Sequence, residues 1–248
     1  MISNAEIKRV KALQSKKFRD ESGLFVVEGE KMVAEALESG LQVEAVYRRD
    51  EIGEQAMARI SSLNSPSPVL AVVRQAAAPD IDEIRSFVRS CGRDMLAIAL
   101  DEIRDPGNLG TIIRLADWYG IDAVFCSAGT VELYNPKVVQ STMGAIFRKK
   151  VIYCDLNNIF DIFASNGLPI YGTFLEGEDI YRSELSSGGL IVMGNEANGI
   201  SPELRSRISA KLFIPPYPGN RKTAESLNVA IATAITISEF RRRRSYSL

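Results

Sequence analysis

The sequence contains no histidine among its 248 residues. This absence excludes Ser-His-Asp and Cys-His catalytic arrangements and the HExxH zinc site, so any chemistry must use other side chains. Cysteine is also scarce, because only Cys91, Cys126 and Cys154 are present and no two of them form a CxxC pair. The spacing fits neither a disulfide framework nor a zinc ribbon, and it predicts a protein of the reducing cytoplasm with no bound metal.

Long apolar runs and a large net charge are missing as well. The longest apolar stretches, such as residues 95–100, are only as long as a strand, and the N-terminal residues lack the apolar region of a signal peptide. We therefore expect neither a membrane span nor a membrane partner. The net charge is -1 and the pI is about 5.8, which disfavours an indiscriminate binder of nucleic acid.

Positive charge is nevertheless concentrated in three places. Six Lys and Arg residues lie within residues 8–19, three more form residues 148–150, and four arginines form residues 241–244. Basic clusters on a neutral protein can contact phosphates, but such runs are more often solvated helix faces or tails. Charge alone leaves both interpretations open.

Two blocks of alternating strands and helices divide the chain. The first block predicts strands at 24–27, 43–47 and 69–73 and helices at 28–39, 54–63 and 81–88. The second predicts strands at 95–100, 123–126, 150–153, 169–174, 189–193 and 211–214, with intervening helices and a long last helix at 225–243. Several of these strands are continuous apolar runs, so we expect an α/β fold with a parallel sheet covered by helices on both faces. The expected domains are residues 1–90, a small α/β domain, and residues 91–248.

The first segment that can carry chemistry is DEIRDPGNLGTIIR, residues 101–114. It follows a predicted strand, and ligands of parallel sheets bind at the carboxyl ends of strands. Gly107 and Gly110 permit a tight turn, Asn108 is a candidate helix cap, and Arg114 lies early in the helix. Neither GxGxxG nor GxxxxGK[ST] is present. Taken alone, the segment is typical of a structural strand-to-helix turn.

Two later segments share that position after a strand. In GLIVMGNEANG, residues 189–199, the strand ends at Gly194, where a ligand can approach the backbone, and Glu196 is either functional or a solvated turn residue. Between Ile214 and Ala230 a Pro/Gly-rich loop leads to Ser226 and Asn228, which are also residue types that cap helices. The apolar helix that follows is expected to be buried in the domain or in a subunit interface.

Together and in this order, the three segments resemble the motifs of the SpoU (TrmH) family of RNA 2'-O-methyltransferases. The matching patterns are Asn108-x-Gly110-x-x-x-Arg114, Gly194-Asn-Glu196-x-x-Gly199, and Ile214-Pro with Ser226-Leu-Asn228-Val-Ala. The resemblance covers about residues 95–240. The stretch FVVEGEKMVAEAL at 25–37 resembles the L30e-like substrate-binding domain that often precedes the catalytic domain in this family.

The resemblance implies an enzyme that uses S-adenosylmethionine and forms a homodimer through its C-terminal domain. It also implies a deep trefoil knot in the catalytic sheet, although chains in general do not thread loops. The family's active-site positions correspond to Asn108, Arg114, Glu196, Ser226 and Asn228. Its cofactor positions correspond to Thr173, Gly194, Ile214 and Leu227. The first motif is expected to face the other two motifs of the partner subunit.

The implied reaction is methyl transfer to a ribose 2'-hydroxyl in structured rRNA or tRNA. Arg114 is expected to stabilise the developing alkoxide, because a guanidinium with a pKa above ~12 is a poor base. The loop at 215–225 is longer than the family usually has, and Arg221 and Lys222 within it either contact phosphate or are solvated.

Two alternatives remain at this point. One is a nonenzymatic RNA-binding protein that retains the methyltransferase fold. The other is a nicotinamide-dependent dehydrogenase, which rests only on the α/β pattern and lacks GxGxxG.

Overall fold

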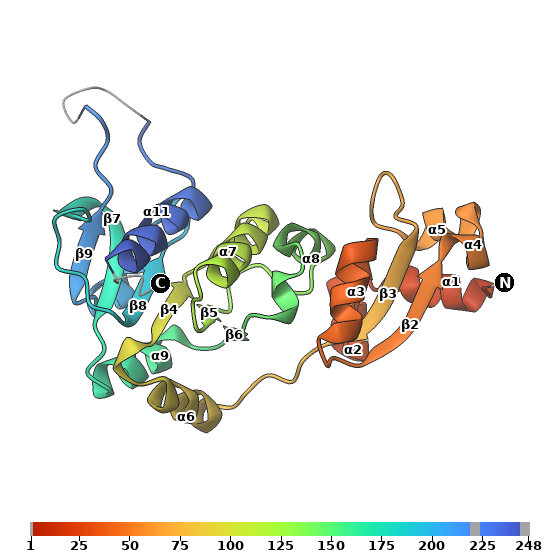
Figure 1. The fold of residues 1–248 in the computed structure, drawn as a ribbon, viewed down its shortest axis with the longest axis horizontal. Coiled ribbons are helices and arrows are strands. Elements are labelled where there is room, and N and C mark those ends of the chain that lie inside the picture. The colour runs from red at the N-terminus through yellow and green to blue at the C-terminus, as the bar shows by residue number, and fades with distance from the viewer. Residues whose placement is uncertain (1, 219–223, 244–248) are drawn as a thin grey trace. The chain divides into compact units, whose positions relative to one another are not determined.

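The computed structural model describes residues 2–218 and 224–243, and the chain divides into two compact units (Figure 1). The first unit comprises Met1–Ala77 and Glu132–Arg148. The second comprises Ala78–Val131 and Lys149–Leu248. The chain therefore passes from one unit to the other three times, since a segment of the first unit is encoded inside the second.

The first unit is built on a three-stranded antiparallel sheet in the order β1-β3-β2. Its strands are β1 (Leu24–Glu28), β2 (Val43–Arg48) and β3 (Val69–Arg74). Its helices are α1 (Asn4–Ala12), α2 (Lys16–Ser22), α3 (Glu30–Glu38), α4 (Arg49–Ile52), α5 (Glu54–Ile60) and α8 (Pro136–Thr142), with a short 3-10 turn at Ala145–Phe147. The helices α1 and α2 were not expected from the sequence, because their charged residues hide a narrow apolar stripe. Ile7 and Val10 of α1 are buried in the core beside the sheet.

Residues 132–148 complete the first unit. The ring of Tyr134 lies 4.5 Å from the ring of Phe25 in β1, measured between centroids. Arg19 of α2 is only 2% exposed, and its Nε donates to Glu132 Oε1 over 2.9 Å. This buried ion pair joins the segment to the N-terminal helices.

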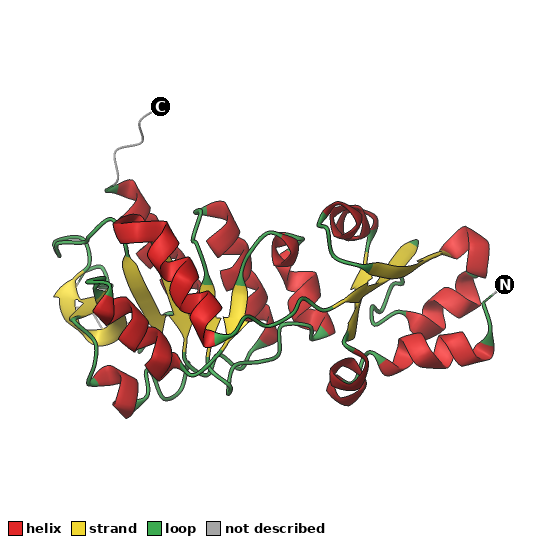
Figure 2. Cartoon of the chain, turned by 90° about the horizontal axis from the view of Figure 1, so that it is seen from below, coloured by secondary structure: helices red, strands yellow, loops and turns green. Residues whose placement is uncertain are grey.

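The second unit contains a six-stranded sheet in the order β6-β5-β4-β8-β7-β9, in which every neighbouring pair is parallel. The strands are β4 (Leu96–Leu100), β5 (Val124–Cys126), β6 (Val151–Tyr153), β7 (Ile170–Asp179), β8 (Gly189–Met193) and β9 (Ala210–Phe213). The helices are α6 (Ile81–Cys91), α7 (Pro106–Trp118), α9 (Leu156–Ser165), α10 (Pro202–Arg205) and α11 (Val229–Arg242), with a 3-10 turn at Gly92–Asp94. The predicted α/β fold with a parallel sheet flanked by helices is confirmed (Figure 2).

Helices cover both faces of this sheet. One face packs against α6 and α9 in a buried cluster that includes Ala97, Ala99 and Ile170. Side chains alternate along a strand, so Tyr171 points away from that cluster. There it meets Phe240 of α11 edge to face, with ring centroids 4.9 Å apart, and α11 in turn packs against α7.

Several boundaries differ from the sequence prediction. The first stretch of the first unit ends at Ala77 and not near residue 90, because Ile84 and Val88 of α6 pack in the same cluster as Met95 of the second unit. Strand β7 extends to Asp179, past an irregularity in its pairing with β9. Within the described ranges, no helix has both the length and the apolarity needed to cross a bilayer.

Candidate active site

The three motif segments meet at one edge of the parallel sheet. The strands that precede them, β4, β8 and β9, run in the same direction in a sheet where β8 and β7 lie between β4 and β9. The carboxyl ends of parallel strands lie at the same edge, which is where ligands bind in such folds. Residues that are about 120 positions apart in sequence are therefore close in space.

The turn after β4 is closed by a residue other than the predicted cap. Asp105 is the N-cap of α7, and its Oδ1 accepts a hydrogen bond from Asn108 N over 2.8 Å, with Pro106 in the first helical position. The expectation that Asn108 caps the helix is therefore wrong. An aspartate three residues earlier does so, which leaves the side chain of Asn108 available at the edge of the sheet.

The turn after β8 explains why a glycine stands at 194. Asn195 N donates to Gly199 O over 3.0 Å, and Gly199 N donates to Asn195 O over 2.8 Å. A Cβ on Gly194 would lie 2.3 Å from the carbonyl carbon of Gly199, and Gly199 itself has φ +67°. The close approach at Gly194 is thus made by the protein's own backbone.

Two residues that the sequence reasoning did not single out hold this turn in place. The amide of Asn195 accepts hydrogen bonds from Ala197 N (2.9 Å) and Asn198 N (3.1 Å) and donates to Glu102 O (2.8 Å). Buried Asp101 accepts from Ser201 N over 2.7 Å. An acid directly after a strand and an asparagine in a turn are the signals that could have identified them.

Two side-chain amides and a carboxylate form a chain of hydrogen bonds that joins all three motifs within one subunit. Asn228 caps α11, and its Oδ1 accepts from Ala230 N (2.9 Å) and Ile231 N (3.3 Å). Asn228 Nδ2 donates to Asn108 Oδ1 over 3.0 Å. Asn108 Nδ2 then donates to Glu196 Oε1 over 2.7 Å.

We call these three side chains, Asn108, Glu196 and Asn228, the amide relay. The two backbone amides at the start of α11 fix which end of the Asn228 amide faces Asn108, and that in turn fixes the orientation of Asn108. The helix cap therefore aims a nitrogen donor at one oxygen of Glu196. The other oxygen, Oε2, forms no hydrogen bond with a residue in the described ranges.

Two other predicted active-site residues, Arg114 and Ser226, form no hydrogen bond with the relay. Arg114 is exposed on α7 and has no hydrogen bond or ion pair to a described residue, and Ser226 is exposed beside the relay. Arg114 is six positions after Asn108 in α7, which places the two side chains about 120° apart around the helix axis. Thus Asn108 meets the second and third motifs of its own chain, contrary to the expected arrangement across subunits, whereas Arg114 does not.

Of the four predicted cofactor residues, Gly194 and Ile214 directly follow β8 and β9, Thr173 lies within β7, and Leu227 precedes α11. Thr173 is on β7, and its Oγ1 donates to Val192 O over 3.3 Å, so the hydroxyl fastens β7 to β8. Half-buried Ile214 follows β9, and Leu227 is 49% exposed just before α11.

Neither thiol nor metal chemistry has a candidate among these residues. Burial raises the pKa of the Cys126 thiol and raises that of Cys154 to about 12, so both are protonated at neutral pH and poor nucleophiles. In residues 2–218 and 224–243, no three His, Cys, Asp or Glu side chains form a group that could hold a metal ion.

The predicted basic clusters largely bind carboxylates of their own unit. The pairs are Lys16 with Asp20, Arg19 with Glu132, Arg148 with Glu35, and Arg242 and Arg243 with Glu239. Arg221, Lys222 and Arg244 lie outside the described residues. These ion pairs leave less free positive charge than the sequence suggests, and they favour a structural role for much of it.

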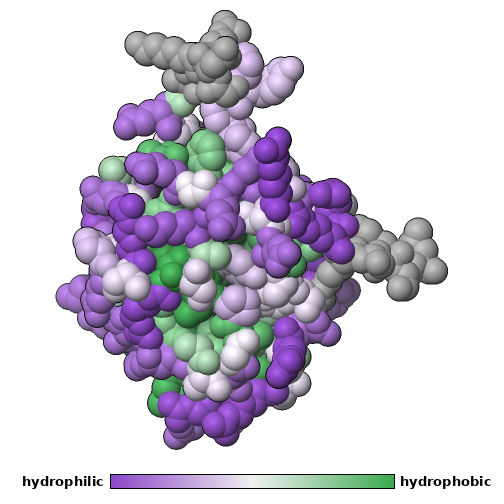
Figure 3. Space-filling view, turned by 90° about the vertical axis from the view of Figure 1, so that its left-hand side faces the viewer, coloured by the Kyte–Doolittle hydropathy of each residue, from purple (hydrophilic) through white to green (hydrophobic). Residues whose placement is uncertain are grey.

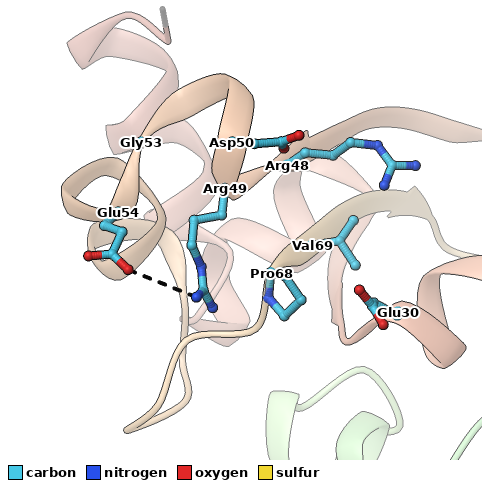
Figure 4. Close-up of a pocket in the computed structure, with 8 residues that line it drawn as sticks. All are labelled: Glu30, Arg48, Arg49, Asp50, Gly53, Glu54, Pro68 and Val69. Atoms are coloured by element: carbon cyan, nitrogen blue, oxygen red, sulfur yellow. Dashed lines mark ion pairs between the residues drawn. The ribbon is translucent and has the colours of Figure 1, made fainter.

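A cavity of about 580 Å³ lies in the first unit and involves no motif residue. Arg49 pairs with Glu54 at 4.0 Å on one wall (Figure 4). The residues that line the cavity are Glu30, Arg48, Arg49, Asp50, Gly53, Glu54, Pro68 and Val69. Acidic and basic side chains are mixed along its walls, so its charge selects neither cations nor anions.

Such a sheet, with polar motif residues gathered at its carboxyl edge, defines an α/β protein that acts on a ligand held by several strand ends. Comparison with known proteins specifies the family. Residues 95–238 match the SpoU rRNA Methylase family, and residues 4–77 match the MRM3-like substrate binding domain. The chain belongs to the SpoU rRNA methylase family.

Relatives match along nearly the whole chain. The 23S rRNA (guanosine(2553)-2'-O)-methyltransferase RlmP of Bacillus subtilis is 31% identical, over 96% of this chain and 96% of that protein. The AdoMet-bound rRNA methyltransferase of Sinorhizobium meliloti superposes with a TM-score of 0.84 at 30% identity, over 98% of this chain and 96% of that one. The SpoU methyltransferase AviRb of Streptomyces viridochromogenes, solved with AdoMet, also gives 0.84, at 25% identity over 98% of both chains.

Proposed function

We propose that this protein transfers a methyl group from S-adenosylmethionine to a ribose 2'-hydroxyl in structured RNA, either rRNA or tRNA. The observation that carries the proposal is the amide relay, which joins one residue from each of the three motifs at the ligand-binding edge of the sheet. Family membership and the rRNA methyltransferases among its relatives support the same reaction.

The methyl donor occupies the strand ends beside the relay. Thr173, Gly194, Ile214 and Leu227 are its proposed neighbours. When bound, S-adenosylmethionine supplies a methyl group on a sulfonium, which is electrophilic without help from a metal or an acid. The protein must therefore hold the 2'-hydroxyl in line with that methyl group and stabilise the oxygen as it loses its proton.

The relay orients the groups that meet the ribose. Asn228 and Asn108 hold Glu196 Oε1, so the carboxylate does not rotate freely, and Oε2 is the part of Glu196 available to a hydroxyl. Exposed Ser226 stands two residues before the cap and is a further hydrogen-bonding group for the ribose. Arg114 is proposed to stabilise the developing negative charge on the 2'-oxygen.

Arg114 has no contact with the relay of its own chain, so its proposed role uses the relay of a second subunit. We propose a homodimer through the second unit, because α7 and α11 carry exposed apolar side chains, with Trp118 84% and Ile231 53% exposed. Arg114 and Trp118 are four residues apart on α7 and share one face. Pairing through that face brings Arg114 to the relay of the partner subunit. Light scattering of the protein and its Trp118→Glu variant tests this, with a shift from dimer to monomer expected.

The finer features that the family implies are part of the same proposal. They are a deep trefoil knot in the second unit, an L30e-like fold of the first unit, an RNA-binding role for that unit, and a cytoplasmic location. Free Cys91, Cys126 and Cys154 agree with a reducing compartment. The match to a substrate-binding domain supports the role of the first unit.

Methyl transfer is tested with labelled S-adenosylmethionine and RNA from cells that lack the enzyme. We expect label on a ribose 2'-oxygen, found by nuclease digestion and mass spectrometry, and loss of the label with Glu196→Ala. Ala210→Ser, a polar substitution outside the relay, serves as the control. RNA binding without transfer to any RNA would instead favour the nonenzymatic alternative.

A further inference from the structure

Two positive side chains share one aromatic ring next to the candidate active site. Phe174 directly follows Thr173 on β7, and the guanidinium carbon of Arg205 lies 5.0 Å from the centroid of its ring. The Nζ of Lys211 lies 5.5 Å from the same centroid. We call Phe174, Arg205 and Lys211 the Phe174 cluster.

Close packing beside Gly172 fixes the position of this ring. A Cβ on Gly172 would lie 2.7 Å from Phe174 Cε2 and 3.2 Å from Ile200 Cδ1, so the ring occupies space that only a glycine leaves. Ile200 directly follows Gly199, the last residue of that turn. Lys211 is the partner of Gly172 in the pairing of β7 with β9. Phe174 therefore lies close to Ile200, the residue that follows the turn carrying Glu196.

The cations of the cluster are not neutralised. Within the described part of the chain, the side chains of Arg205 and Lys211 form no hydrogen bond, and no carboxylate lies within 4.0 Å of either cation. Arg207, two residues further on, provides the contrast. It also lies over a ring, that of Phe160 at 5.4 Å, but it forms an ion pair with Asp161.

An aromatic ring orients a cation without consuming its hydrogen-bond donors. Arg205 and Lys211 are exposed, and their donors remain free for an external anion. Figure 3 views the chain from the side on which β9 lies in Figure 1, and hydrophilic residues surround apolar surface on this face.

We infer that the Phe174 cluster binds a backbone phosphate of the RNA next to the methylated ribose. The inference rests on the proposed function. Phosphate is the anion that a guanidinium and an ammonium together recognise, and S-adenosylmethionine carries no phosphate, so the RNA is its source. A contact with a phosphate positions the RNA strand without recognising a base, so it determines how the ribose enters the site.

The test compares variants in which a positive side chain of the cluster is replaced by glutamine with a variant that loses one positive charge elsewhere. Arg205→Gln, Lys211→Gln and the double variant each lose cluster charge. Arg182→Gln is the control, since Arg182 is 89% exposed and is paired with Asp179 at 3.6 Å. The probes are 23S rRNA transcribed in vitro and unfractionated tRNA. The Kd of each RNA is measured at several salt concentrations, and the Kd of S-adenosylmethionine is measured separately.

The double variant is expected to weaken RNA binding about three- to tenfold and to lower the slope of log Kd against log salt by about 1. The control, the affinity for S-adenosylmethionine and the melting temperature should be unchanged. An unchanged salt slope, or a loss of S-adenosylmethionine affinity alone, overturns the inference, as does a wild-type protein that binds neither RNA. RNA binding can be measured without turnover. A protein that binds RNA but does not methylate it would refute the proposed reaction, while the measured effect of the cluster variants on RNA binding would still test the inference.

Discussion

Arg19 in the first unit and the amide relay in the second are both networks of polar side chains, but they differ in exposure. Arg19 is buried, and its guanidinium binds Glu132 and the carbonyl oxygen of Leu13, so each donor group it uses ends on the protein. In the relay Glu196 and Asn228 are exposed and Asn108 is half-buried, and Glu196 keeps one oxygen without a partner in the described residues.

This difference fits a network that holds the fold in the first unit and, as proposed above, one that serves chemistry in the second. A buried charge must be fully paired, because an unpaired one costs several kcal/mol. An exposed carboxylate has no such need, so an ordered one indicates that its orientation matters for a ligand. The comparison predicts that changes in the first network alter stability, and that changes near the second alter turnover.

The largest effect is expected at Arg114. Arg114→Ala should reduce kcat about 10²- to 10³-fold, the usual loss when one stabilising donor at a developing oxyanion is removed. Because Arg114 is exposed and unpaired among the described residues, the melting temperature should not change. Single-turnover methylation with a circular-dichroism melt measures both quantities, and Thr111→Ala on the same helix is the control. A variant with normal kcat contradicts the role given to Arg114.

The second prediction concerns Arg19. Arg19→Met should lower the unfolding free energy of the first unit by about 3 kcal/mol, because Glu132 loses its partner. Urea unfolding measures the loss, and the affinity for S-adenosylmethionine should remain normal. The exposed pair of Lys16 and Asp20 is the matched control, since Lys16→Met should cost less than about 1 kcal/mol. Equal losses in both variants would remove the distinction between the two networks.

A third prediction separates the two roles of Asn228, which caps α11 and donates a hydrogen bond to Asn108. Asn228→Asp keeps the oxygens that cap α11 but removes the Nδ2 donor to Asn108, so kcat should fall about tenfold with no loss of stability. Asn228→Ala should lower kcat and also destabilise the protein by about 1 kcal/mol, because the cap is lost. Measurements of kcat and of the melting temperature for both variants distinguish the loss of the donor from the loss of the cap. An aspartate variant with full activity would mean that the relay plays no part in turnover.

The smallest effect is expected from Glu6 of the first unit. Hydrogen bonds from Arg9 and Tyr47 hold the pKa of the Glu6 carboxyl below its ordinary value. A lowered pKa in the folded state adds stability at neutral pH, and this is lost as the pH falls through that lowered value. Glu6→Gln should therefore reduce the melting temperature slightly at pH 7 and match the wild type near pH 3. A difference that persists in acid would contradict this cause.

Local patterns were enough to predict most elements of the second unit. Apolar runs at 95–100 and 189–193 form adjacent buried strands, β4 and β8. These features succeed because backbone propensity, caps and burial on both faces are set by neighbouring residues. The helices α1 and α2 were missed because their few apolar positions are scattered among charges.

The sequence by itself determined the α/β class, the parallel sheet and which three turns carry polar residues, since each depends on residues close together in the chain. The tertiary structure alone decided that residues 132–148 belong to the first unit, that Arg19 is buried against Glu132, and that Gly194 accommodates the backbone of Gly199. It also decided that a helix cap at Asn228 orients Glu196 through Asn108. Each of these is a contact between segments distant in sequence, and such contacts depend on how the elements pack.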